Sequence, residues 1–536
     1  MKQLVSKFRK ISQLGPIVPL ITISSPRMNQ RFHRCMASTL LAVAAVAGCA
    51  VGPNFHAPKA PADAGYTSEP LPPTTASTGG SGGDPQTFVS GQDVSYKWWE
   101  AFGSAAIDSL VEKSFRANPT VKAAQAALKQ AQEMVYAQQG YFFPSVGVDY
   151  GFSRQQIAGN LGGNDPGPQG NGTDITARAP AAPVIYNMHT AEVTVGFTPD
   201  VFGGNRRKVE SLDAQARMQR YELEATYISL ASNVVAAAIQ EASTRAQIKA
   251  TEQIIAHNEK SLAIVRNKFN SGFATRVDLA AQELQLAQAK ALLPPLRKQF
   301  EQNRDLIRAL VGNLPNQDVA ETFELKSLTL PPQLPLSLPS KIIEQRPDIR
   351  AAEENLHAAN ANVGVAVAAM LPQFSITGVA GGEATQFSQM FSSGGPFWSL
   401  IGDVAQPLFD GGTLLHEKRA ANQALRQAAA QYQSTVLQAY QNVADTLHAI
   451  VSDADALTAA VDAEEAAKVA LDLAHQRMQS GYGDYLSELT AGMVYAQAVL
   501  SEVQARATRL GDTAALYQAL GGGWWNRGGA VPVAAN

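Results

Sequence analysis

An internal repeat constrains the fold of this chain more than any other feature. The segment NPTVKAAQAALKQAQ begins at Asn118, and the similar segment RPDIRAAEENLHAAN begins at Arg346. Three further pairs of landmarks follow in the same order: FPSVGVDYGF with LPQFSITGVA, TPDVFGGN with QPLFDGGT, and KFNSGF with RMQSGY. Four matches in one order indicate two copies of one unit, joined by the Pro-rich segment LPPQLPLSLPS.

Each copy contains one very long stretch that favours a helix. Residues 205–271 and residues 413–480 contain neither Gly nor Pro. At 1.5 Å per residue, each helix would be about 100 Å long. A returning helix follows in each copy. Pro294 and Pro295 should interrupt the first of these with a kink, because Pro removes a helical hydrogen bond. In the second long stretch, coiled-coil spacing is set by Leu425, Ala429, Tyr432, Val436, Ala439, Val443, Thr446 and Ile450.

The shorter segments between the helices have the alternation of β-strands. In the first copy Val146, Val148, Tyr150 and Phe152 alternate with small or polar residues, and a second run does the same. That second run contains Val193, Val195 and Phe197, and the weaker pattern of the second copy contains Phe374, Ile376, Trp398, Leu400 and Val404. Such strands suit a membrane sheet that faces lipid on one side and water on the other. The alternative is a small soluble hairpin with one buried face.

Four strands cannot close a barrel, and open sheet edges are not tolerated in lipid, so several chains would have to share one barrel. Two chains would supply eight strands, whose interior is filled by side chains. Three chains would supply twelve and leave room for passage. A conducting oligomer is therefore expected to be at least a trimer.

Cys49 ends an apolar run in the segment LAVAAVAGCAVGPNF. Arg31 and Arg34 precede that run, and small residues precede the cysteine, which is the pattern of an export signal. The residues before Cys49 also resemble the bacterial lipobox, in which cleavage occurs before the cysteine and its sulfur carries lipid. Residues 1–48 are then the signal peptide, with Met28 as the expected start of translation. The alternative is an ordinary export signal with a bystander cysteine.

The composition excludes several classes of function. A net charge of −3 does not suggest a nucleic-acid partner. No run of about 20 apolar residues follows Cys49, so any membrane span would consist of strands. No Walker loop, zincin motif or nucleophile elbow is present. Three acid–His pairs at helical spacing could suggest a di-iron site, but only Glu354 and His357 form a true Glu-x-x-His motif. We expect no metal, no cofactor and no enzymatic activity.

Several short motifs carry a family resemblance over most of the chain from Cys49 onward. In order, CAVGPNF, WWEAFG, QRPDIRAAEENLHAANANVGVA, LPQFSITG, PLFDGG and ALGGGW resemble signatures of the TolC-like outer-membrane factors. Specifically, they are similar to the NodT-type lipoproteins of resistance-nodulation-division efflux systems. Ser104-Ala105 depart from the pattern where an Asp is common, and Glu488 departs where an apolar residue is common.

The resemblance implies a mainly α fold with a membrane β-barrel, in which a homotrimer builds a 12-stranded β-barrel that continues into a long α-helical barrel. It implies a passive outer-membrane channel of a Gram-negative tripartite efflux pump, which conducts small molecules from the periplasm to the exterior. Ala50 after the cysteine implies an outer-membrane destination, with helices projecting into the periplasm. The alternative function is a lipid-anchored structural or adhesive coiled-coil surface protein.

The expected organisation has five parts after the signal peptide. A lipid-anchored extension covers residues 49–95, and the first repeat covers 96–329. The Pro-rich linker covers 330–345, the second repeat 346–522 and a C-terminal tail 523–536.

Two turns, SGFATRVDL (271–279) and SGYGDYL (480–486), join the long helices to the returning helices. The resemblance implies that a periplasmic adaptor, or membrane fusion protein, docks on these tips and connects the channel to an inner-membrane resistance-nodulation-division transporter. The expected docking residues are Gly272, Phe273, Thr275, Asp278, Leu279, Gly481, Tyr485 and Leu486. The alternative is that the turns are only capped ends of a coiled coil.

Asp484 lies in the second turn, where the resemblance places the closure of the channel. Three copies near the axis of a trimer would form a carboxylate ring that favours cations. The alternative is that Asp484 caps the following helix, where an acidic residue is also favourable.

Overall fold

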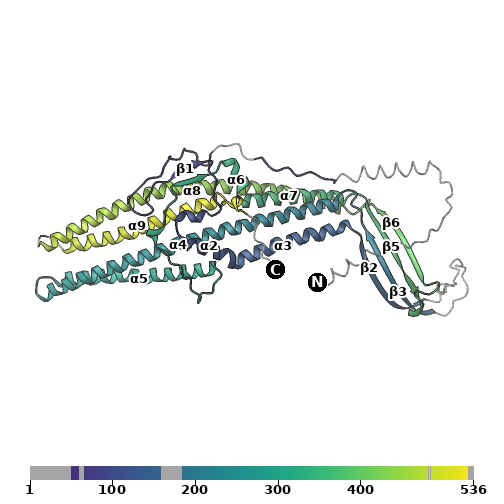
Figure 1. Ribbon diagram of the computed structural model, residues 1–536, viewed down its shortest axis with the longest axis horizontal. Helices are drawn as coiled ribbons and strands as arrows, with labels where there is room; N and C mark the ends of the chain where they lie inside the picture. Colours follow the sequence, from purple (N-terminus) through teal and green to yellow (C-terminus); the bar gives the residue numbers. More distant parts are fainter. Residues whose placement is uncertain (1–49, 60–64, 158–183, 481, 483–484, 529–536) are drawn as a thin grey trace, which may run out of the picture. The chain divides into compact units, whose positions relative to one another are not determined.

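The computed structural model describes residues 50–59, 65–157, 184–480, 482 and 485–528. Cys49 and the signal segment therefore lie outside the described residues. The first half of the chain forms the elements α3 (Pro119–Gln139), β2 (Ser145–Ile157), β3 (Val184–Phe197), α4 (Gly204–Asn270) and α5 (Arg276–Leu310). Helix, strand, strand, long helix and returning helix follow one another as predicted (Figure 1).

The second half has the same order of elements. It forms α7 (Pro347–Ala368), β5 (Gln373–Ala384), β6 (Pro396–Ala405), α8 (Thr413–Gln479) and α9 (Tyr485–Ala519). The long helices α4 and α8 have 67 residues each, and the returning helices α5 and α9 have 35 residues each. α4 packs along α5 and α7, and α8 packs along α9 and α7 (Figure 1).

The beginnings of the helices follow from local sequence. Asn118 caps α3 because its side-chain oxygen accepts a hydrogen bond from the Thr120 amide at 2.8 Å, and Pro119 occupies the first helical position. Gly203 and Gly412 precede α4 and α8 with φ angles of +76° and +92°. These left-handed conformations, which glycine adopts readily, let the chain turn from strand into helix.

The apolar stripe of α8 differs slightly from the predicted heptad. Tyr432, Val436, Ala439, Val443 and Ile450 are buried as expected. Leu425, Ala429 and Thr446 are only partly buried. Ala428 and Leu447 take the buried positions instead. An α-helix has 3.6 residues per turn and not 3.5, so a straight helix moves its buried face forward by about one residue over several turns.

Pro294 and Pro295 lie inside α5 and do not end it, and the kink expected at this point stays a prediction. The two prolines have no backbone N–H groups, so two carbonyl oxygens of the preceding turn lack their helical hydrogen-bond donors. Both proline rings are exposed, however, so no neighbouring element is displaced by them. Buried residues on either side, including Ala289 and Ile307, hold the helix against its neighbours across the defect.

The strands form one four-stranded antiparallel sheet in the order β2-β3-β5-β6. Val148 is paired with Val193, Val193 with Ala380, and Ala380 with Trp398. Since directly paired residues point to the same side, one face of the sheet carries the predicted apolar residues of all four strands. Most of these side chains are exposed in the single chain, and Trp398 is 79% exposed. β2 and β6 are the two edges of the sheet.

The segment predicted as a Pro-rich linker contains β4 (Gln333–Leu336) and α6 (Pro339–Gln345). β4 pairs in parallel with β1 (Thr87–Ser90) from the N-terminal extension. Leu334 of β4 is fully buried. The linker and the extension are thus parts of the structure that surrounds the helices, and this pairing joins segments about 245 residues apart in the sequence.

An aromatic core lies beside this small sheet. Trp98 belongs to a 3-10 helix (Trp98–Phe102) that precedes α2 (Ala105–Ala117). Its ring stacks on Tyr517 near the end of α9, with ring centroids 5.3 Å apart.

Short 3-10 helices also cover Gly140–Phe142, Leu325–Ser327, Phe387–Gln389 and Trp524–Asn526. Among the described residues, no helix is both long and apolar enough to cross a membrane.

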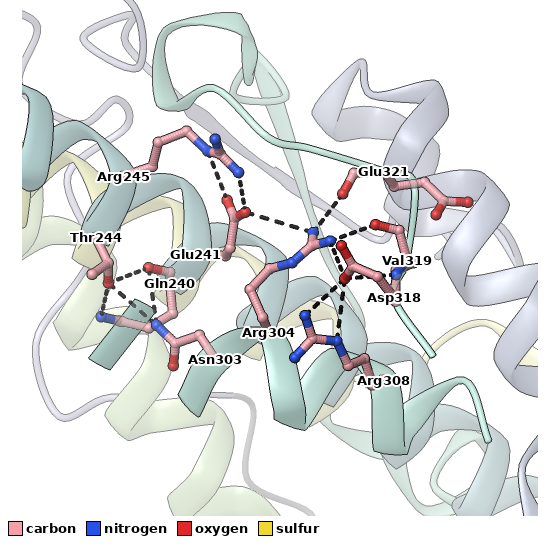
Figure 2. A network of polar contacts seen from close by, with 10 residues as sticks. All are labelled: Gln240, Glu241, Thr244, Arg245, Asn303, Arg304, Arg308, Asp318, Val319 and Glu321. Carbon is pink, nitrogen blue, oxygen red and sulfur yellow. Dashed lines mark hydrogen bonds and ion pairs between the residues drawn. The ribbon is translucent and has the colours of Figure 1, made fainter. Parts of the chain in front are cut away.

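A network of charged residues ties the segment after α5 to the helices (Figure 2). Glu241 of α4 is fully buried and accepts a hydrogen bond from Arg245 at 2.5 Å, while Arg304 of α5 lies 3.8 Å away. Arg304 also donates to the carboxylate of Asp318 and to the carbonyl oxygen of Glu321, both at 2.7 Å. One buried guanidinium therefore connects α4, α5 and the segment that follows them.

Arg308 strengthens the outer side of this network. It donates to the carboxylate of Asp318 at 2.8 Å, one helical turn from Arg304 (Figure 2). Hydrogen bonds from Arg308 and Arg304 lower the pKa of Asp318. The carboxylate therefore remains ionised and able to hold both arginines over a wide range of pH.

Candidate functional site at the paired helix turns

The two predicted tips are at the ends of the α4–α5 and α8–α9 pairs that lie away from the sheet (Figure 1). In the first turn, Gly272 has a φ angle of +79°, which permits the chain to reverse. The amide of Gly272 donates to the carbonyl of Phe269 and that of Phe273 donates to Lys268, so the last carbonyls of α4 are satisfied. The Phe273 side chain is 84% exposed.

Thr275 and Asp278 form a capping box at the start of α5. The Thr275 hydroxyl accepts a hydrogen bond from the Asp278 amide at 3.2 Å, and the Asp278 carboxylate accepts from the Thr275 amide at 2.7 Å. The hydrogen bonds from the Thr275 hydroxyl and amide lower the pKa of Asp278. Leu279 is buried, so in this arrangement it supports the turn from inside and does not offer a surface contact.

In the second turn, Gly481, Gly483 and Asp484 lie outside the described residues. Tyr482 is almost fully exposed, and Leu486 at the start of α9 is also exposed. A shallow groove lies just above this turn, between α8 and α9. Its lining is mostly apolar or small and comprises Ala467, Ala470, Leu486, Ser487, Thr490, Ala491 and Val494.

Tyr485 is directed to the other helix pair and not to solvent. Its hydroxyl donates a hydrogen bond to the side-chain oxygen of Gln282 on α5. The amide nitrogen of Gln282 in turn donates to the carbonyl oxygen of Asn258 on α4 at 3.2 Å. Burial, together with the nearby carboxylates of Glu488 and Asp278, raises the pKa of Tyr485. The two predicted tips are thus connected through a partly buried polar contact.

Gln282 and Asn258 were not predicted as site residues. Both are polar residues at buried positions of their helices. Helical spacing could have indicated that Gln282 is buried. It lies three residues after Leu279 and seven before Ala289, on the buried side of α5. Glu488, which departs from the pattern of the family, also has a partner inside the tip. Its carboxylate lies 2.7 Å from Nδ1 of His475 on α8.

Glu354 and His357, the true Glu-x-x-His pair, lie 3.5 Å apart and each also has a further partner. His357 Nε2 lies 3.0 Å from the carboxylate of Glu210, and Arg217 lies 3.0 Å from the carboxylate of Glu354. Within the part of the chain that the structure describes, no group of three or more His, Cys, Asp or Glu side chains is arranged to hold a metal ion.

Asp453 on α8 has a strongly shifted pKa. Burial and the neighbouring Asp512 carboxyl raise the pKa of Asp453 from 3.8 to about 7. For an acid whose pKa is higher in the folded state, ionisation opposes folding. This cost is absent below about pH 4, grows as the pH rises through the interval between the two pKa values, and is complete above about pH 7.

The variant Asp453→Asn is therefore expected to raise the midpoint of thermal unfolding at pH 8 and to leave it nearly unchanged at pH 4. Circular dichroism of the purified protein in detergent would measure both midpoints. Asp445→Asn, at an exposed position of the same helix, is the matched control. Equal shifts at the two pH values would contradict the proposed titration.

Comparisons with known proteins agree with this geometry. The family model described as "Outer membrane efflux protein" matches residues 110–313 and 338–522. The pyoverdine export outer membrane protein OpmQ of Pseudomonas putida is 27% identical over 85% of this chain and 94% of its own length. The antibiotic efflux pump outer membrane protein ArpC of Pseudomonas putida is 27% identical over 92% of this chain and 97% of its own length.

Two solved structures have the same fold. The outer-membrane channel OprN has a TM-score of 0.76 and 26% identity, covering 89% of this chain and all of its own. The Campylobacter jejuni CmeC outer membrane channel has a TM-score of 0.75 and 20% identity, covering 89% of this chain and 95% of its own. The matched residues make up more than half of the chain and include both long helices and the sheet. The chain therefore belongs to the outer membrane efflux protein family.

Proposed function

We propose that three copies of this chain form one passive duct, in which twelve strands close a barrel and the long helices extend it into the periplasm. The observation that carries this proposal is the four-stranded sheet with an apolar face and two free edges, β2 and β6. Free strand edges cannot remain in lipid, so further copies must pair with them. Helices of about 100 Å, which follow directly from β3 and β6, lengthen the duct on the periplasmic side.

The protein is an outer-membrane channel of an efflux pump, as its family and its relatives indicate. This function is favoured over a structural or adhesive surface protein. The proposal adds that the channel is passive and that an inner-membrane resistance-nodulation-division transporter drives export through a periplasmic adaptor. The adaptor would dock on the paired turns, where Phe273, Tyr482 and Leu486 are exposed. A partner could bury these side chains.

Planar-bilayer recording tests the proposed duct. Purified full-length protein should form trimers and carry a voltage-driven ion current. A structural surface protein would give no current under the same conditions. Trimers that insert without conducting would overturn the duct, and monomers that conduct would overturn the shared barrel.

We further propose that Cys49 carries the lipid anchor. Cys49→Ser is expected to block processing of the precursor and to abolish labelling of the protein by a radioactive fatty acid, because the sulfur is the acceptor. Gel electrophoresis of labelled cells measures both effects. Cys35→Ser, upstream of the expected cleavage, is the control and should not change the labelling. Undiminished labelling of Cys49→Ser would reject the lipobox.

Asp484 is proposed as the gate, on the resemblance and on its place in the second turn. A ring of three carboxylates should attract cations and repel itself, so Asp484→Ala is expected to change both the conductance and the cation selectivity of reconstituted trimers. If Asp484 only caps α9, the variant should instead lower thermal stability and leave conduction as in the wild type. The second outcome would remove Asp484 from the gate.

A further inference from the structure

The two halves of the chain meet where α4 of the first half packs along α7 of the second. We call this contact the internal seam. β3 pairs with β5, α4 follows β3 and α7 precedes β5, so the internal seam continues the pairing of these two strands. Since α4 leads away from the sheet and α7 leads towards it, the two helices are antiparallel.

Contacts along the internal seam follow one register. A methyl group at Gly364 of α7 would lie 2.8 Å from the side chain of Arg207 on α4. Further from the sheet, Arg217 of α4 lies 3.0 Å from the carboxylate of Glu354 on α7. From the first contact to the second, α4 advances by as many residues as α7 goes back, as antiparallel helices require. All four residues are buried or half-buried in the single chain.

The same positions of α3 and α8 are exposed. Pro119 and Pro347 are the first residues of α3 and α7, while Gly203 and Gly412 precede α4 and α8, which have 67 residues each. These landmarks align α3 with α7 and α8 with α4, residue by residue. The positions that correspond to the internal seam carry exposed side chains, namely Ala126, Glu133 and Tyr136 on α3, and His416, Arg419 and Arg426 on α8.

We propose that α8 packs along α3 of a second copy of the chain, in the register of the internal seam. β6 leads into α8 and α3 leads into β2, so pairing of these two free sheet edges would bring the two helices side by side. The proposal rests on the shared barrel of the proposed function. It adds which residues of the two copies face each other.

The register brings opposite charges together between the copies. It places Arg419 of α8 opposite Glu133 of α3 in the second copy, two turns nearer the sheet than Arg426. Both Arg419 and Glu133 are exposed in the single chain. Lys129 lies one turn from Glu133 on α3, so without Glu133 the charge contact with Arg419 would be repulsive. Glu133 is therefore the residue of α3 that makes this contact attractive.

Apolar side chains are exposed at the sheet end of the same surface. Leu408 and Phe409, between β6 and α8, are 93% and 92% exposed, and Phe143, between α3 and β2, is 72% exposed. At the sheet end of the internal seam, Phe202 lies beside Phe374, with ring centroids 6.3 Å apart. A second copy would bury apolar surface in the corresponding place.

Cross-linking of the full-length protein in detergent tests the register. Ala126→Cys combined with Arg426→Cys should give covalent oligomers with a short bismaleimide, because the register places these positions opposite each other. Ala126→Cys combined with Leu437→Cys is the matched control, since Leu437 is exposed on the same helix about 16 Å further from the sheet. The control and each single variant should give at least tenfold less cross-linked product.

Charge reversal tests the ion pair without new cysteines. Arg419→Glu and Glu133→Arg should each speed dissociation of the oligomer about fivefold, because both place like charges opposite each other. The combined variant should restore the wild-type rate. Lys468→Glu, at an exposed position of α8 beyond the reach of α3, should leave the rate unchanged.

The outcomes separate this surface from the duct. Oligomers that do not cross-link between positions 126 and 426 would overturn the register and leave the shared barrel in place. A combined variant that dissociates as fast as the single variants would overturn the ion pair. A wild-type protein that stays monomeric would overturn the shared barrel together with the proposed contact.

Discussion

Arg304→Ala is expected to destabilise the protein by about 3 kcal/mol, because it removes a buried charge from the centre of a network. Glu241 is fully buried and would keep only Arg245 as a partner. The carbonyl oxygens of Val319 and Glu321 would lose their donor. Each unsatisfied buried group costs about 1–3 kcal/mol. The loss should therefore appear both in global stability and in the segment that follows α5.

Thermal unfolding of the purified protein, followed by circular dichroism, measures the global effect. Limited proteolysis between residues 311 and 324 measures the release of the segment. Arg297→Ala is the matched control, since Arg297 lies on the same helix and its ion pair with Glu252 is exposed on both sides. Exposed pairs contribute about 0–1 kcal/mol. Similar losses in the two variants would show that burial of the Arg304 network is not what stabilises this region.

Sequence patterns predicted those helices and strands well whose formation depends only on the residues within the element itself. The absence of Gly and Pro was enough to predict the lengths of α4 and α8, because a helix that has started continues through residues that favour it. Alternation was enough for the four strands and for the face that each apolar residue takes. Pro294 and Pro295 do not end α5, since packing on both sides of a defect can maintain a helix that local hydrogen bonding disfavours.

Contacts between distant segments could not be predicted. β1 pairs with β4, which lies about 245 residues later in the sequence. The short runs TFVS and QLPL carry no pattern that identifies the two strands as partners. Gly364 could be seen in the sequence as an unusual residue inside a helix, but only the structure shows that the backbone of Val51 and Gly52 occupies the space beside it. Charge networks such as that of Arg304 likewise depend on burial, which a sequence does not display.

The candidate site at the tips was predicted in part for the same reason. Turn chemistry identified Gly272, and the Thr-x-x-Asp spacing is present for the capping box. The sequence did not separate exposed from buried members of the tips, and Leu279 proves to be buried while Phe273 is exposed. Nor did it reveal that Tyr485 contacts Gln282, because this contact joins the two halves of the chain.

The largest functional effect is expected from charges placed on the tips. Phe273→Asp combined with Leu486→Asp should reduce docking of the proposed periplasmic adaptor at least tenfold, since burying even one unpaired carboxylate at an interface costs more than the 1.4 kcal/mol that a tenfold loss represents. Both side chains are exposed in the single chain, so folding should not suffer. Cysteines introduced at Thr275 and Ser487 would measure docking by cross-linking to the adaptor in cells.

Two controls separate docking from damage to the channel. Leu314→Asp introduces the same charge at an exposed leucine that follows α5, at the other end of that helix from the tips, and should leave cross-linking at the wild-type level. The double variant should also keep the bilayer conductance of the wild-type protein, because the exposed side chains at 273 and 486 are proposed to serve the partner and not the pore. Unchanged cross-linking in the double variant would mean that the tips are only capped ends, while loss of both cross-linking and conductance would mean that the charges had disrupted the channel itself.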